Sequence, residues 1–180
     1  MINVPFINMG ESQLIRKEVL KFITSSMNGL DIGSAGSPII PQAVSLDRVN
    51  GHFTDNVQLR GNADNLKWFT DNCLDYIFSS HCYEDFTPQE KPRILLEWSR
   101  VIKIGGYILL YLPDEQEFIK HCAQTGQNRN YDHKDPYFSL TSVQNIVKNH
   151  PILTQRLKEV FTISKHEAYS FFVVYQKIGI

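Results

Sequence analysis

Small residues crowd one stretch of this sequence, GLDIGSAGSP. Asp31 ends a short apolar run there, and the residues from Gly33 to Gly36 all have small side chains or none. Such residues let backbone N–H groups approach a ligand closely. A tight turn between a strand and the next element would favour the same residues for packing alone. The turn by itself therefore leaves ligand binding and packing equally open.

Polar groups at the ends of later apolar runs give this turn chemical partners. Asp47 lies sixteen residues after Asp31, and a carboxylate after the second strand accepts both ribose hydroxyls in dinucleotide-binding folds. The stretch GNADNLKW then offers amide and carboxylate groups at the height of an adenine ring, and Ser79 and Ser80 end a fourth run. An exposed acid at a strand end is the alternative interpretation of Asp47. Together, however, these groups predict a nucleoside-containing ligand at one edge of a sheet.

Two histidines are candidates for a general base, because imidazole titrates nearest to neutral pH. His81 directly follows the fourth apolar run. His133 lies with Tyr131 and Lys134 in the polar loop NRNYDHKDPYFSL, and long loops of this kind often carry function. The alternatives are a hydrogen-bonded His81 that does not titrate during catalysis and a solvated His133.

The elements that must position these groups follow from apolar periodicity. Strands are expected through Leu30 and Ile32 and at Ala43–Arg48, Val57–Leu59, Cys73–Ser80, Tyr107–Pro113, Leu157–Ile163 and Tyr169–Ile178. Helices are expected at Ser12–Ser25, from a capping box at Thr87 to Gly105, at Glu115–Cys122 and around Val143–Val147. Too few residues separate the last two strands for a crossover helix, so they form an antiparallel hairpin. The predicted fold is a three-layer α/β fold with a mostly parallel sheet.

Length, composition and charge limit the classes of function that this chain can have. A chain of 180 residues suits a single domain, spanning 1–180, and a net charge of −1 argues against nucleic acid as a partner. No apolar run approaches the roughly 20 residues of a membrane span, and the N-terminus lacks the features of a secretory signal. Three cysteines without CxxC spacing favour a location in the reducing cytoplasm. The adjacent His-Cys pairs are poorly spaced for chelation of one ion, so no metal site is predicted.

Five motifs in register resemble those of class I S-adenosylmethionine-dependent methyltransferases, and of methyltransferase domain type 11 in particular. The glycine turn is LDIGSAG, the acidic motif is SLDRV, and GNADNL follows the third strand. DNCLDYIFSSHCYEDF matches the fourth-strand motif, and WSRVIKIGGYILLYLP matches the helix and fifth strand. The resemblance covers Gly29 to Pro113. It implies a Rossmann-like methyltransferase fold and S-adenosyl-L-methionine as the cofactor.

The resemblance also implies roles for individual residues. The implied cofactor-binding residues are Asp31, Gly33, Ser34, Ala35, Gly36, Asp47, Arg48, Asn62, Ala63, Asp64, Ser79 and Ser80. Among them, Asp47 would take the ribose hydroxyls and Asn62 would frame the adenine. His81 and His133 would be catalytic, and Tyr83, Tyr131 and Lys134 would contact the substrate. This chain departs from the family pattern at Asn62, where an acid is usual, and within the glycine turn.

The implied activity is methyl transfer to a small-molecule or glycan acceptor, with oxygen as the expected nucleophile. The DHK-aromatic loop is similar to the substrate loop of methyltransferases found with polysaccharide biosynthesis. Enzymes that methylate bases have an Asn/Asp-Pro-Pro-aromatic motif where this chain has Ser-Ser-His-Cys. Two alternatives stay open: a dinucleotide-dependent oxidoreductase, and a weak or inactive cofactor-binding module that acts as a partner subunit. The sequence leaves the oligomeric state undetermined.

Overall fold

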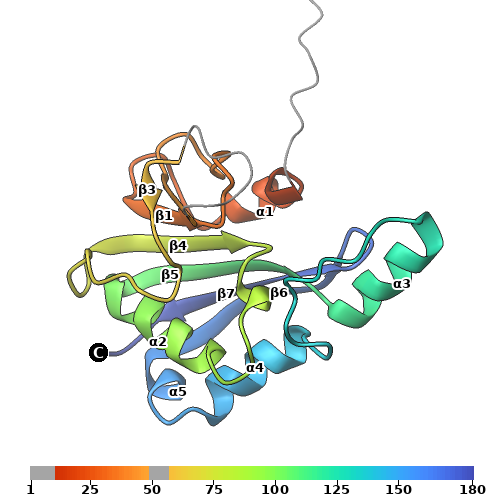
Figure 1. The fold of residues 1–180 in the computed structure, drawn as a ribbon. Helices are drawn as coiled ribbons and strands as arrows, with labels where there is room; N and C mark the ends of the chain where they lie inside the picture. The colour runs from red at the N-terminus through yellow and green to blue at the C-terminus, as the bar shows by residue number, and fades with distance from the viewer. Residues whose placement is uncertain (1–10, 49–56) are drawn as a thin grey trace, which may run out of the picture.

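The computed structural model describes residues 11–48 and 57–180. The N-terminal stretch, for which no secretory signal is expected, lies largely outside these residues. Seven strands form one sheet in the order β3-β2-β1-β4-β5-β7-β6 (Figure 1). The strands are β1 Gly29–Ile32, β2 Val44–Asp47, β3 Leu59–Arg60, β4 Leu74–Ser80, β5 Ile102–Pro113, β6 Leu157–His166 and β7 Ser170–Lys177. β7 is antiparallel to both of its neighbours, β5 and β6, and the other strand pairs described in this sheet are parallel. The predicted mostly parallel sheet with an antiparallel C-terminal hairpin is confirmed.

The register of the central strands sets the position of the site. Ile32 at the end of β1 pairs with Leu46 of β2 on one side and with Ser79 of β4 on the other. β1 is buried along its whole length, as its apolar composition predicts for a strand inside a parallel sheet. The carboxyl ends of β1, β2 and β4 therefore meet at one edge.

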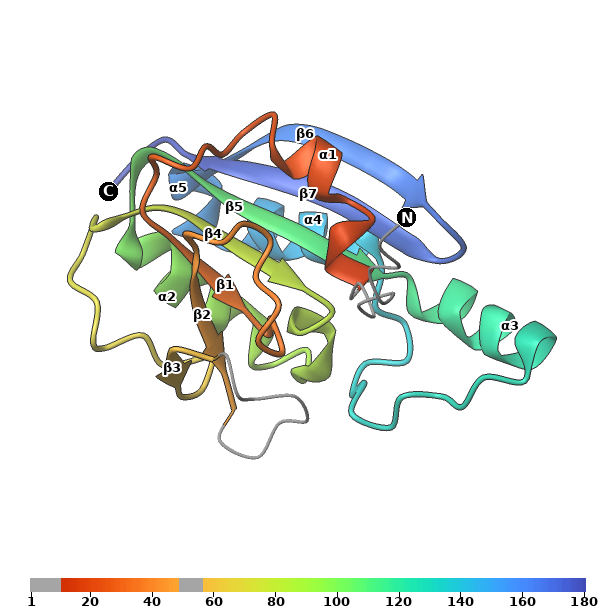
Figure 2. The same ribbon diagram turned by 90° about the horizontal axis from the view of Figure 1, so that it is seen from above.

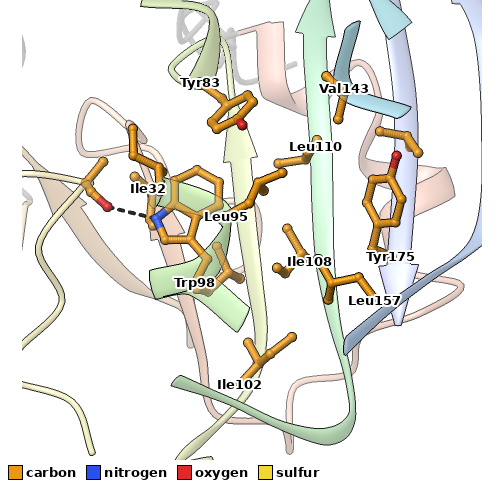
Figure 3. Close-up of a cluster of buried hydrophobic side chains, with 14 of the residues drawn as sticks. Ile32, Tyr83, Leu95, Trp98, Ile102, Ile108, Leu110, Val143, Leu157 and Tyr175 are labelled. Atoms are coloured by element: carbon orange, nitrogen blue, oxygen red, sulfur yellow. Dashed lines mark hydrogen bonds between the residues drawn. The ribbon is translucent and has the colours of Figure 1, made fainter. Parts of the chain in front are cut away.

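Helices cover one face of the sheet. The α-helices are α1 Arg16–Val19, α2 Lys91–Val101, α3 Glu115–Thr125, α4 Leu140–Asn149 and α5 Leu153–Arg156, and the 3-10 helices are η1 Glu11–Gln13 and η2 Tyr83–Asp85. α2, α4 and α5 pack beneath the sheet, around a core that contains Trp98, Leu110 and Tyr175 (Figures 1 and 3). None of the helices within the described residues is long and apolar enough to cross a membrane.

The opposite face has little helix. The helix predicted over Ser12–Ser25 is reduced to α1 and flanking turns. Its apolar positions Ile15, Val19 and Ile23 are still fully buried, so the periodicity identified the correct face. The segment between β1 and β2 forms turns instead of a helix, as its two prolines predict, and Ile39 packs there against the sheet.

Among the boundaries that differ from the sequence-based expectation are the start of α2 and the start of β5. Glu90 accepts hydrogen bonds from Thr87 N (2.9 Å) and Oγ1 (2.7 Å), as in a capping box, but α2 begins one turn later. β5 starts directly after α2 and runs through the glycines that were expected to end the helix. A Cβ on Gly106 would lie 2.5 Å from the carbonyl oxygen of Asp75 on β4. The glycine thus permits close approach of two strands.

Candidate functional site

A cavity of about 320 Å³ opens at the carboxyl ends of β1, β2 and β4. Its lining comprises Ile32, Gly33, Leu46, Asp47, Arg48, Gly61, Asn62, Ala63, Asp64, His81, Cys82, Asp85, Phe86, Asp132 and Lys134. The last two belong to the segment that returns from α3, which projects beyond the sheet, towards α4 (Figure 2). The volume is at the lower end of those found for small-molecule sites. Residues far apart in sequence therefore enclose one small-molecule cavity.

The glycine turn reaches the cavity at Gly33, which is part of the lining. Gly33, Ala35 and Gly36 have φ angles of +77°, +49° and +80°. Gly33 donates its N–H to the Leu46 carbonyl oxygen (2.9 Å), and a Cβ at Gly33 would lie 2.6 Å from Cβ of Cys82. Both the left-handed backbone and the lack of space therefore require glycine at position 33.

Asp47 joins the turn to the end of β2. Its Oδ2 accepts the N–H of Ala35 (2.8 Å) and its Oδ1 accepts the N–H of Arg48 (2.7 Å). Each carboxylate oxygen has lone pairs for a further donor. Asp47 can therefore hold the turn and accept hydroxyl groups from a ligand in the cavity at the same time.

The loop after β3 forms the opposite wall. Asn62, Ala63 and Asp64 all line the cavity. The indole Nε1 of buried Trp98 donates to the carbonyl oxygen of Ala63 (2.7 Å; Figure 3). Arg93 pairs with Asp64 (2.9 Å). The core residue Trp98 thus positions the wall where the adenine was predicted to lie.

Several predicted cofactor residues lie behind the cavity lining. Asp31, Ser79 and Ser80 are buried within the sheet. Ser34 Oγ is hydrogen-bonded to Ser45 Oγ and accepts the N–H of Gly36 (3.3 Å). The positions of these residues indicate that they shape the turn and the strand ends.

The structure changes the interpretation of the predicted substrate residues. Tyr83 is fully buried in the core, and its hydroxyl donates to the Lys91 carbonyl oxygen (2.7 Å), so it does not fit the predicted contact with substrate. Tyr131 is 92% exposed and is not part of the lining. Lys134 does line the cavity, as a substrate contact requires.

Buried Asp31 gives a prediction for stability. Burial raises its pKa from 3.8 to about 8, opposed by a hydrogen bond from the Ile39 N–H. Between these two pH values the folded chain holds a proton that the unfolded chain has lost, so stability falls as pH rises through this window. Asp31→Asn keeps an acceptor for Ile39 and cannot ionise. At pH 8 we expect the free energy of unfolding of this variant to exceed that of wild type by on the order of 2 kcal/mol. Urea denaturation of both proteins at pH 5 and pH 8 measures the difference. If the stability of the two proteins changed equally between these pH values, the prediction would be contradicted.

His81 lies at the rim between β4 and η2, with a φ of +49°. Its Nε2 is 3.1 Å from Oε2 of Glu11, and its ring contacts the edges of Tyr111 and Tyr169. Burial lowers the pKa of His81, and the charge of Glu11 opposes this effect. The neutral ring, which can accept a proton, therefore predominates at neutral pH.

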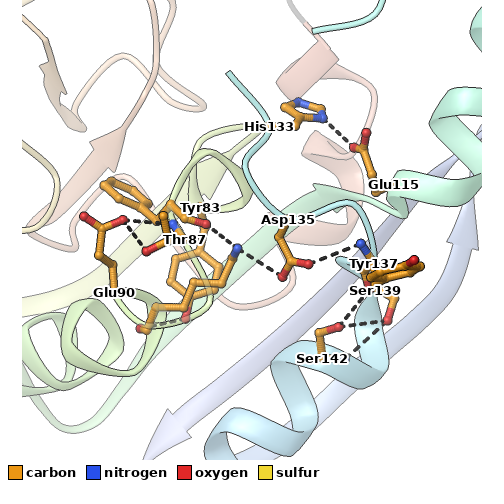
Figure 4. A network of polar contacts seen from close by, with 11 residues as sticks. Tyr83, Thr87, Glu90, Glu115, His133, Asp135, Tyr137, Ser139 and Ser142 are labelled. Carbon is orange, nitrogen blue, oxygen red and sulfur yellow. Dashed lines mark hydrogen bonds and ion pairs between the residues drawn. The ribbon is translucent and has the colours of Figure 1, made fainter. Parts of the chain in front are cut away.

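His133 lies behind the rim instead of in the lining, and its side chain is only 5% exposed. Its Nδ1 is 2.5 Å from Oε2 of Glu115 (Figure 4), and its Nε2 is 3.7 Å from Oε1 of Glu84. The loop position predicted from sequence is correct, but the solvated alternative is not what the structure shows. His133 is held between two acids.

Seven lining residues are not among the site residues predicted from sequence: Ile32, Leu46, Gly61, Cys82, Asp85, Phe86 and Asp132. Cys82, Asp85 and Phe86 lie within five residues after His81, so their place after β4 was a usable signal. Arg48 Nη2 lies 3.6 Å from Oδ2 of Asp85 and 3.7 Å from Oδ2 of Asp132. This bridge between three loops depends on tertiary structure, and no local pattern indicates it.

A family model and several solved structures are similar to this chain. Residues 29–110 match the family model described as a methyltransferase domain. This segment is a methyltransferase domain. The resemblance of the motifs to a methyltransferase domain is thereby confirmed over residues 29–110.

Solved structures share the fold at low sequence identity. The PH0226 protein of Pyrococcus horikoshii is 15% identical with a TM-score of 0.71, over 91% of this chain and 88% of that one. An S-adenosylmethionine-dependent methyltransferase of Archaeoglobus fulgidus is 15% identical with a TM-score of 0.68, over 93% of this chain and 95% of that one. Another from Aquifex aeolicus is 16% identical with a TM-score of 0.61, over 93% of this chain and 92% of that one. A search of curated proteins finds no match.

Proposed function

We propose that this methyltransferase methylates a hydroxyl group of a small polar molecule or a sugar unit of a glycan. The observation that supports this acceptor class is the polar rim of the cavity, formed by Asp85, Asp132 and Lys134 beside His81. Carboxylate and ammonium groups at a rim suit an acceptor with several hydroxyls, which both accept and donate hydrogen bonds. The link to polysaccharide biosynthesis is part of this proposal.

The cavity residues fit the cofactor predicted for them. When bound, S-adenosylmethionine supplies an electrophilic methyl group on a sulfonium. Asp47 has free lone pairs for the ribose hydroxyls, and the wall at Asn62 and Ala63 lies where the adenine would pack. Gly33 is part of the lining, and the methionine part would lie against its backbone. Because methyl transfer is an in-line displacement, the main contributions of the protein are alignment and exclusion of water.

His81 is the proposed base. It lines the cavity and is neutral at neutral pH, so it can accept the hydroxyl proton of the acceptor as the oxygen attacks. For His133 we keep the expectation that its loss lowers turnover while cofactor affinity is retained. The buried contacts of His133 with Glu84 and Glu115 suit a supporting role behind the base.

Replacement of His81 tests the assignment. Asparagine tolerates a positive φ, so His81→Asn keeps the backbone and removes the base. We expect turnover with a sugar or polyol acceptor to fall by about 100-fold or more, while the affinity for S-adenosylhomocysteine measured by calorimetry stays within a factor of three. His121→Asn in α3, outside the cavity, is the control.

The same calorimetry separates the alternatives. Binding of S-adenosylhomocysteine near micromolar affinity supports the enzyme, and binding of NAD in its place would support an oxidoreductase. Cofactor binding with no turnover on any hydroxyl acceptor would favour the partner-subunit module. Full activity of His81→Asn would remove His81 from the mechanism.

A further inference from the structure

Three side chains beside the cavity form a cluster that methyl transfer does not explain. Glu84 and Asp85 in η2 and His133 in the returning loop each offer one ligand atom, and these atoms lie within 4.8 Å of one another. The cluster joins the end of β4 to a loop about fifty residues later. We propose that Glu84, Asp85 and His133 bind a divalent transition-metal ion, which goes beyond the proposed methyl transfer.

The buried carboxylate of Glu84 is the strongest indication of a metal site. The residue is 1% exposed, and neither carboxylate oxygen has a hydrogen bond. Its nearest recorded contacts are His81 Nδ1 and His133 Nε2, each 3.7 Å from Oε1. Buried carboxylates without a partner are costly, because the charge has lost its hydration. A bound cation would supply the interaction that this side chain lacks.

Asp85 has one oxygen free for the same ion. Its Oδ2 faces Arg48 at 3.6 Å, whereas Oδ1 is buried and has no hydrogen bond. Asp85 also lines the cavity, so it connects the proposed metal site to the space for the ligand. An ion held here would be reachable from that space.

The third ligand is already oriented. Glu115 accepts a hydrogen bond from Nδ1 of His133 when that nitrogen carries the proton, so the lone pair of the neutral ring is on Nε2, which faces Glu84. A carboxylate behind a ligating histidine is a common arrangement that fixes the tautomer of the ring. Glu115 is therefore assigned as a positioning residue and not as a ligand.

The spacing and ligand types define the class of ion. Bonds of about 2.1 Å place tetrahedral ligand atoms about 3.4 Å apart, close to the 3.7 Å between Glu84 and His133. Two carboxylates and one imidazole suit Zn²⁺ or Mn²⁺, whereas Mg²⁺ favours oxygen ligands alone. Three protein ligands also leave a position open for water or another oxygen ligand.

Lys91 does not satisfy Glu84 in place of a metal. Its charge acts on Glu84 at longer range, but its ammonium group donates to the Phe86 carbonyl oxygen and to Asp135 at 3.4 Å (Figure 4). Lys91 thus leaves both carboxylate oxygens of Glu84 without a direct partner.

Metal binding can be measured on the whole chain without any methyl acceptor. The protein is stripped with a chelator and then dialysed against Zn²⁺, Mn²⁺ or Mg²⁺, and bound metal is measured by elemental analysis. We expect one equivalent of Zn²⁺ or Mn²⁺, much weaker binding of Mg²⁺, and a higher melting temperature with the ion that binds.

Variants locate the binding. Glu84→Gln and Asp85→Asn should each weaken metal affinity by at least about 100-fold, and Glu115→Gln by about 10 to 100-fold. Glu117→Gln is the matched control, since Glu117 lies on the same helix as Glu115 and pairs with Lys120 and Lys165 at the surface. Asp85→Asn, which is partly exposed, keeps the test valid should Glu84→Gln fail to fold.

Two results would overturn the metal site. One is the absence of metal binding by a protein that binds S-adenosylhomocysteine. The other is binding of metal that Glu84→Gln, Asp85→Asn and Glu117→Gln leave equally strong. Conversely, metal binding without S-adenosylhomocysteine binding would refute the proposed cofactor pocket and keep the metal site, so the two proposals fail separately.

Discussion

Asp47→Ala is expected to weaken the affinity for S-adenosylhomocysteine about 100-fold. The variant removes a carboxylate that would accept two ribose hydroxyls, and hydrogen bonds to charged groups contribute about 1.5 to 3 kcal/mol each. A loss near 3 kcal/mol corresponds to about a hundredfold rise in Kd. The variant also frees the N–H of Ala35, which loosens the glycine turn. Isothermal titration calorimetry with S-adenosylhomocysteine measures the effect.

Two further variants identify the cause of this loss. Asp47→Asn keeps one oxygen acceptor without the charge, so its affinity should lie between those of wild type and alanine. Asp71→Ala removes an exposed carboxylate that pairs with Arg100 away from the cavity, and it should bind as wild type does. Circular dichroism should show an intact fold in all three, since Asp47 lies at the rim of the sheet. An unchanged Kd for Asp47→Ala would exclude Asp47 from the cofactor site.

The residues at the edge of the sheet could be predicted from sequence, because an apolar run gives way to a polar residue or a glycine where each of these strands ends. Asp47 ends an apolar run, and Gly33 follows another, so parallel pairing alone brings them together. The boundaries that failed depend on tertiary contact. Gly106 was expected to end a helix because glycine breaks helices, but here it lies against the backbone of β4. Helix propensity depends on local sequence and gives no information about a contact with another strand.

Burial of polar groups was the other limit on prediction. The family resemblance implies a substrate contact for Tyr83, yet η2 turns its ring into the core. Glu84, beside it in sequence, was assigned no role. Its meaning depends on His133, which reaches it from the returning loop. A sequence read locally does not show which loops meet.

Replacement of Trp98 should have the largest effect on stability. Trp98 is fully buried in α2, and Trp98→Ala should lower the free energy of unfolding by about 3 to 5 kcal/mol. Such a loss is a large part of the roughly 5 to 15 kcal/mol that stabilises a typical domain. Urea denaturation followed by far-UV circular dichroism measures the effect. A loss below about 1 kcal/mol would contradict the placement of this side chain in the core.

Trp98→Phe separates packing from positioning of the site. Phenylalanine keeps most of the apolar volume but cannot donate to the Ala63 carbonyl oxygen, which fixes the cavity wall. We expect a smaller loss of stability and a Kd for S-adenosylhomocysteine raised about 3 to 10-fold, because one hydrogen bond contributes about 1 kcal/mol. Tyr175→Phe is the matched control: Tyr175 belongs to the same core cluster, but its buried hydroxyl has no hydrogen bond to lose. Equal affinity of Trp98→Phe and Tyr175→Phe would show that the wall at Ala63 does not depend on the indole, whereas a loss confined to Trp98→Phe ties the core directly to the cofactor site.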